Sequence, residues 1–152
     1  MKREIKFRGY NLKNKMWIYG YYLVNRGKHY IVQDKTAHPF DEASDFEVDP
    51  ESVGQFVGEY KGKPIYEGDR VKVNETDGYK CQYVGFVVYD YVNSRFAVNK
   101  RLQVGGLGGF EKIPITGEKQ TGALGMGGSY DFYYKYEVIG NEYETRKDTS
   151  NP

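Results

Sequence analysis

The alternation of apolar and polar positions predicts short strands separated by turns in the first part of the chain. Ile5 and Phe7 alternate with charged neighbours, which is the period of two expected for a strand with one solvated face. A run that is apolar or aromatic on both faces follows, and then a shorter apolar run. We expect strands at 4–8, 16–24 and 29–33, with turns at 11–15 and 25–28. These signals predict a β meander within residues 1–45.

The next part of the chain carries the clearest turn signals. Pro50 after an aspartate predicts an extended residue followed by a bend and one short helical turn. A tight corner at 67–69 precedes a strand in which Val71 and Val73 face inward. The run at 82–92 is apolar on both faces and is expected at the centre of a sheet. We group residues 46–100 and 130–144 as a barrel-like part of the same domain.

Glycine dominates residues 101–130, which interrupt this pattern. A segment with so few apolar side chains offsets little of its backbone entropy by burial, so we expect a mobile loop with one short strand at 112–116. The sequence predicts a last strand at 130–140 and a frayed polar tail at 145–152.

Composition strengthens the β assignment. The chain has 16 Tyr, 8 Phe and one Trp and is poor in Leu and Ala, so side chains that suit a pleated surface outnumber strong helix formers. We therefore predict a mainly β fold with very little helix, built either as two small packed β subdomains or as a partly open SH3-like barrel within a single domain.

Charge is segregated along the chain although the formal net charge is only +1. Residues 1–33 carry a net charge of +7 and residues 34–59 one of −7. Either the acidic segment lies near the basic strands or forms a solvated loop, or the basic residues form a face that is open to a partner. The near-zero total argues against a protein that chiefly coats nucleic acid or an anionic membrane.

Cysteine and histidine are scarce, which bears on metal sites and location. Cys81 has no second cysteine to pair with, and His29 and His38 do not form a zinc-type cluster. There is no apolar run of signal-peptide or membrane-spanning length. We expect a cytoplasmic protein with no metal, no cofactor and no membrane association.

Two segments of the sequence contain residue types that are found in catalytic sites. The glycines at 117 and 122 lack the following Lys and Ser/Thr of a phosphate-binding loop, so nucleotide binding is not predicted. Glu67 and Asp69 could act as an acid–base pair, which keeps a small enzyme or an enzyme remnant as the alternative function. The favoured interpretation is that Asp69 braces its turn through backbone hydrogen bonds.

Aromatic residues interleaved with basic ones supply the remaining functional signal. Such a pattern is typical of surfaces that stack nucleic-acid bases, but tyrosines on a small β protein also serve cross-strand packing, self-association or a protein partner. The candidate binding surface consists of Lys6, Arg8, Lys13, Lys15, Trp17, Arg26 and Lys28, with Tyr19, Tyr21 and Tyr22 nearby. Packing or self-association is favoured over nucleic acid.

Several segments resemble, in order along the chain, those of the YopX family of phage and prophage proteins. The opening "IKFRGY" carries the family's pattern at Lys6, Phe7, Arg8 and Tyr10, and "KMWIYG" is similar to its second strand. The longest similar stretch is "VDPESVGQFVGEYKGKPIYEGDRVKV" at 48–73, and "YEVIGNEYE" at 136–144 is similar to its closing strand. The glycine-rich segment departs from the family pattern as an insertion.

The resemblance implies an all-β protein made in the cytoplasm of an infected or lysogenic bacterium, and it implies no particular activity. We expect the matching positions to have structural roles; they are Pro50, Gly54, Gln55, Gly58, Gly68 and Asp69. Arg8 and Gln55 are either buried hydrogen-bond anchors, which we favour, or recognition groups. The resulting hypothesis is a non-enzymatic accessory binding module for protein or nucleic acid, with a homo-oligomer as one form of that role.

Overall fold

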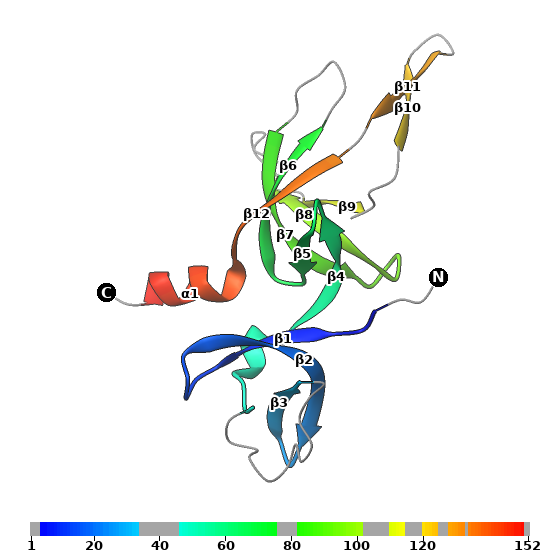
Figure 1. Ribbon diagram of the computed structural model, residues 1–152. Coiled ribbons are helices and arrows are strands. Elements are labelled where there is room, and N and C mark those ends of the chain that lie inside the picture. The colour runs from blue at the N-terminus through cyan, green and yellow to red at the C-terminus, as the bar shows by residue number, and fades with distance from the viewer. Residues whose placement is uncertain are drawn as a thin grey trace. The chain divides into compact units, whose positions relative to one another are not determined.

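The computed structural model describes residues 4–33, 46–75, 82–101, 110–114, 120–124, 128–132 and 134–150 (Figure 1). Its strands form two five-stranded sheets and one two-stranded sheet, all antiparallel in the described pairings, and the sheets remain open rather than closing into a barrel. The prediction of a mainly β fold with little helix is confirmed. The chain divides into two compact units at Gly58, and each is described separately.

The first unit is a twisted sheet with the strand order β3-β2-β1-β4. Its elements are β1 (Phe7–Asn11), β2 (Met16–Asn25), β3 (Lys28–Val32), the 3-10 helix η2 (Pro50–Ser52) and β4 (Gly54–Tyr60), whose last residues run into the second unit. The first half of β2 pairs with β1 and its second half pairs with β3. The predicted meander is therefore present, with β4 added beside β1.

Gly20 lies where β2 passes from one partner strand to the other. A Cβ atom at this position would lie 2.1 Å from the backbone oxygen of Val32 in β3. Real Cβ atoms do not approach backbone this closely, so β3 can take this path only beside a glycine.

The core of the first unit lies on one side of this sheet. Ile18, Ile31 and Val48 are buried together, and Phe7, Tyr22 and Val53 pack against them. Val48 reaches the core because residues 46–49 bond to two strands: the Val48 amide donates to the His29 carbonyl (2.9 Å), and the Asp49 amide donates to that of Tyr10 (3.0 Å). Residues 46–58, which the sequence pattern grouped with the second half, thus belong to the first unit.

The second unit is a sheet with the strand order β12-β6-β7-β8-β9. Its elements are β5 (Lys63–Tyr66), β6 (Asp69–Glu75), β7 (Gln82–Asp90), β8 (Arg95–Arg101), β9 (Phe110–Pro114), β10 (Gln120–Leu124), β11 (Gly128–Phe132), β12 (Tyr134–Asn141) and the helix α1 (Glu142–Ser150). Val71 and Val73 are fully buried as their alternation predicts, and Val87 and Val98 join them in the core.

Two segments differ from their prediction. The glycine-rich region contains β9, which overlaps the short strand expected at 112–116. It also contains the paired strands β10 and β11 in place of a loop, because strand pairing uses backbone groups that glycine also carries; the rest of the region lies outside the described residues. The described part of the expected frayed tail, residues 145–150, belongs to α1, which Asn141 caps by accepting a hydrogen bond from the Glu144 amide (2.8 Å). Tyr143 is buried, and the Glu142 amide donates to the Gly68 carbonyl (2.8 Å), so the start of α1 is held in the unit.

Candidate functional site

The first half of β2 presents a row of aromatic side chains on the side of the sheet opposite the core. Side chains alternate along a strand, so Trp17, Tyr19 and Tyr21 point away from the side that buries Ile18. Tyr10 of β1 is paired with Trp17 and lies on the same side. We call the surface formed by Tyr10, Trp17, Tyr19 and Tyr21 the aromatic face.

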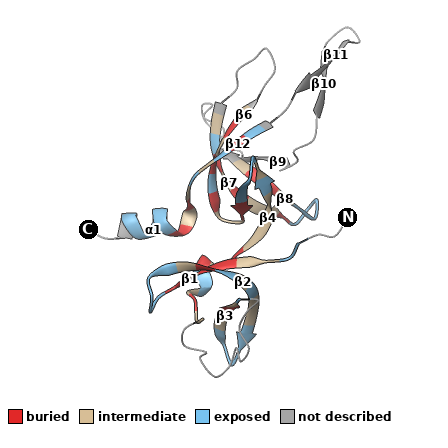
Figure 2. Ribbon diagram, viewed as in Figure 1, coloured by how far each residue is buried: buried red, intermediate tan, exposed pale blue. Residues whose placement is uncertain are grey.

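Tyr19 and Tyr21 are the exposed part of the aromatic face. Their exposed fractions are 47% and 55%, and Figure 2 shows how little of this stretch of β2 is buried. Trp17 is half-buried and contacts Tyr10 edge to face, with ring centroids 5.6 Å apart. Rings that are ordered by a strand and half open to solvent provide contact area at small entropic cost.

Arg8 is paired with Tyr19 and so lies on the same side of the sheet, but it is buried. Only 8% of the residue is exposed, and its guanidinium carbon lies 4.8 Å from the centroid of the Trp17 ring. A guanidinium stacked on an indole face is held by the attraction between the cation and the ring. Arg8 therefore packs against Trp17 on this side of the sheet and exposes little of its side chain.

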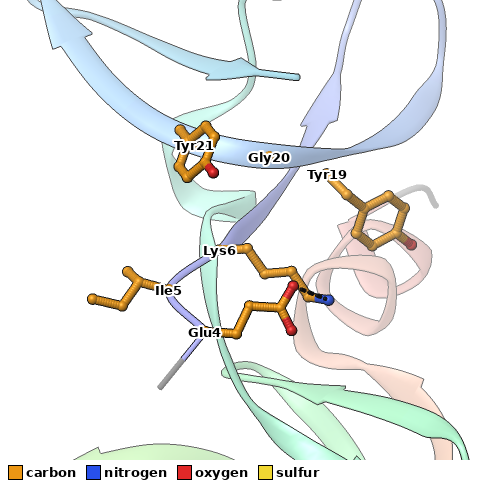
Figure 3. Close-up of a pocket in the computed structure, with 6 residues that line it drawn as sticks. All are labelled: Glu4, Ile5, Lys6, Tyr19, Gly20 and Tyr21. Carbon is orange, nitrogen blue, oxygen red and sulfur yellow. Dashed lines mark ion pairs between the residues drawn. The ribbon is translucent and has the colours of Figure 1, made fainter. Parts of the chain in front are cut away.

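A small pocket opens beside the exposed tyrosines (Figure 3). It has a volume of about 160 Å³ and is lined by Glu4, Ile5, Lys6, Tyr19, Gly20 and Tyr21. The figure shows the side chains of Glu4 and Lys6 meeting beside the stretch of β2 that carries both tyrosines. Lys6 Nζ lies 3.1 Å from the Glu4 carboxylate and 4.4 Å from the centroid of the Phe56 ring. The two charges of the pocket thus offset each other.

The remaining basic candidates do not gather around the aromatic face. Lys13 and Lys15 lie in the turn before β2, whereas Arg26 and Lys28 lie at the turn after it. The ten residues of β2 separate the two turns by roughly 30 Å along the strand.

Lys28 is also engaged with an acidic residue. Its ammonium lies 2.8 Å from the carboxylate of Glu47, and this hydrogen bond and charge raise the pKa of Lys28 above its ordinary value of 10.5. Among the described residues, the predicted basic surface is therefore divided between the two ends of β2.

Four of the motif residues lie in η2 and β4. Pro50 starts η2, whose N-terminus is capped by Asp49 Oδ1, and the expected short helical turn is present. Gly54 pairs with Arg8 and Gln55 pairs with Phe7, so both lie in β4. A Cβ at Gly58 would meet nothing within 4 Å among the described residues, so their packing does not require a glycine there.

Gly68 and Asp69 form the predicted corner between β5 and β6. Gly68 has a φ of 81°, which glycine adopts without strain. The carboxylate of Asp69, a residue only 1% exposed, accepts a hydrogen bond from the Tyr66 amide at 2.8 Å, so Asp69 braces the turn. Glu67 is half-buried beside it. The hydrogen bond to the Tyr66 amide commits Asp69 to its turn, which is the favoured interpretation of this residue.

The pocket was missed at the sequence level because its residues come from two segments. Tyr19 and Tyr21 stand in a run that is apolar on both faces, so the pattern does not say which face is solvated. The signal that was available is the spacing of Trp17, Tyr19 and Tyr21, which puts three rings on one face of any strand. Glu4, Ile5 and Lys6 are brought beside them by the pairing of β1 with β2.

Comparison with known proteins adds no relative: no family model matches the chain, and neither a curated protein nor a solved structure matches it. The described part of the chain contains no group of three or more His, Cys, Asp or Glu side chains arranged to hold a metal ion. No helix in that part is long and apolar enough to cross a membrane.

Proposed function

We propose that the chain is a non-enzymatic binding module that contacts a partner protein through the aromatic face of the first unit. The observation that carries this proposal is that Tyr19 and Tyr21 stand half exposed and side by side on one face of β2, next to a pocket. Tyrosine and tryptophan are the residues that most often anchor protein interfaces, because they bury much apolar area with few rotatable bonds.

A protein partner is favoured over nucleic acid by the distribution of charge. Binding of nucleic acid draws most of its affinity from cations that contact phosphates. Here Arg8 is buried against Trp17, Lys6 is paired with Glu4, and the other candidates are split between the two ends of β2. A surface whose rings are exposed and whose nearest cations, Lys6 and Arg8, are engaged suits a protein partner better.

The alternative of a small enzyme at the acidic corner has weaker support, because the carboxylate of Asp69 is buried and bonded to the backbone of its own turn. Membership of the YopX family, with a phage origin and a cytoplasmic location, remains part of the proposal. Its support is the order of the similar segments, of which "IKFRGY" and "KMWIYG" form β1 and the start of β2. A second copy of the chain is one candidate for the partner.

Site-specific photocrosslinking tests the proposal. The photoreactive amino acid p-benzoylphenylalanine replaces Tyr19 in one version of the full chain and Tyr91 in the other, and both are irradiated in bacterial cells and as pure protein. Tyr91 is a matched control because it is 83% exposed and lies in the second unit. We expect a discrete protein adduct from position 19 and none from position 91. Equal labelling from the two positions, or none from position 19, contradicts the proposal.

Fluorescence anisotropy separates the two classes of partner. Labelled single- and double-stranded DNA and RNA are titrated with the full chain at two salt concentrations, after its mass has been measured by light scattering. We expect either no binding of these nucleic acids or an affinity that changes little between the two salt concentrations. Steep salt dependence shows that several phosphates are contacted and overturns the preference for a protein partner.

A further inference from the structure

The pocket beside Tyr19 and Tyr21 is the size of a single small ring. Its volume of about 160 Å³ is well below the roughly 300–1,000 Å³ of sites that hold cofactors and drug-sized ligands. A cavity of about 150 Å³ is known to accept benzene. The pocket therefore has room for one ring-sized group of a partner, and the rest of that partner must lie outside it.

The lining indicates that this group carries no charge. Glu4 and Lys6 are the charged residues of the lining, and they form an ion pair with each other at 3.1 Å. A ligand charge of either sign would attract one of them and repel the other. The uncharged side chains that line the pocket are the rings of Tyr19 and Tyr21 and the apolar side chain of Ile5.

The exposure of the walls indicates a ring that enters only a short way. Ile5 and Tyr21 are each 55% exposed and Tyr19 is 47% exposed, so the pocket is shallow. A phenylalanine or tyrosine ring stands away from its backbone and buries about 150–250 Å², which requires a deeper cleft. A proline ring is fused to the backbone and needs little depth.

We propose that the pocket receives a proline of an extended, proline-containing segment of a partner protein. Proline-rich segments adopt the polyproline II conformation before binding, so they lose little entropy and bind to shallow grooves lined by aromatic rings. This inference rests on the proposed function, because it gives the chemistry of the protein that the aromatic face contacts.

The probe is a decaproline peptide, titrated into the ¹⁵N-labelled full chain while amide spectra are recorded. Gly20 and Lys6 line the pocket and report on it through their own amides. We expect both amide signals to move in a saturable way with a dissociation constant near 1 mM, which suits the contact of one ring. A Gly-Ser peptide of the same length should move neither signal.

Three variants locate the contact. Y21A is expected to weaken decaproline binding by about tenfold or more, whereas Y21F keeps the ring and should stay within about twofold of the unchanged chain. Y91A removes a still more exposed tyrosine from the other unit and should change nothing. Trp17 fluorescence during urea unfolding checks that Y21A retains the folded first unit.

Each remaining outcome overturns the proposal. Decaproline that leaves Gly20 unmoved, equal binding by Y21A, or stronger binding of a phenylalanine peptide or of oligothymidine would each do so. A crosslink from position 19 together with no decaproline binding rejects the proline and leaves the binding module in place. The absence of both rejects the inference and the proposed function together.

Discussion

Replacing Gly20 by alanine should destabilise the first unit strongly, although the substitution adds only one methyl group. The added methyl carbon would lie 2.1 Å from the carbonyl oxygen of Val32 and 2.7 Å from its carbonyl carbon. Both are backbone atoms of β3, which is paired with the second half of β2, so they cannot rotate away as a flexible side chain would. The overlap can be relieved only if β2 and β3 move apart.

We expect the free energy of unfolding to fall by about 3 kcal/mol. This is the upper part of the range for overpacked positions, because the backbone has to move. With a dependence on urea of about 1.5 kcal/mol per molar, the unfolding midpoint should fall by about 2 M. Trp17 is the chain's single tryptophan and lies in the first unit, so its fluorescence follows the unfolding of that unit without a label.

Gly58→Ala is the matched control, because Gly58 is also a strand glycine of the first unit and a Cβ there would meet nothing within 4 Å. We expect this variant to be unchanged or up to about 1 kcal/mol more stable, since alanine reduces the freedom of the unfolded chain. If the two variants shift the midpoint equally, or if Gly20→Ala leaves it unchanged, the close approach of β3 does not govern the stability of this unit.

Three further changes probe the turns and the ion pair. Asp69→Ala leaves the buried Tyr66 amide without its acceptor and should cost about 1–3 kcal/mol in urea unfolding followed by circular dichroism, whereas Asp69→Asn retains an acceptor and should cost less. Asn141→Ala removes the cap of α1 and should cost about 1 kcal/mol, measured as faster hydrogen exchange of the helix amides. Glu47→Gln should lower the pKa of Lys28 toward 10.5 in an NMR titration of its side chain. Since Glu47 raises that pKa, the contribution of the pair to stability is complete below pH 10.5 and is lost as pH rises through the higher folded-state value.

Features set by neighbouring residues could be predicted from the sequence. Pro50 after Asp49 produced the expected short helical turn, and the corner at Gly68 and Asp69 formed with Asp69 as its brace. The alternation around Val71 correctly gave the buried side of β6. In each case the structure is determined by residues a few positions apart, so the local sequence is enough to predict it.

Features set by distant residues could not be predicted in this way. Lys28 meets Glu47 across 19 positions, so counting charges by segment could not show which cations are engaged. Asn141 caps the start of α1, and the Gly68 carbonyl accepts a hydrogen bond from the first amide of the helix. The second contact joins residues far apart in the sequence, so the residues around 142 do not predict it.

Gly20 connects the fold of the first unit to its candidate site. The run in β2 is apolar on both faces, so its pattern alone would tolerate a shift of one residue, and such a shift would exchange the core side for the aromatic side. The shift would put Tyr19 or Tyr21 at the point where β3 passes, and neither can occupy it because even a Cβ atom overlaps the Val32 backbone there. Gly20 thus selects which rings reach the solvent, and it also lines the pocket between them. Any binding by that pocket should therefore weaken in Gly20→Ala together with the stability of the first unit, although the substitution adds no atom to the aromatic face.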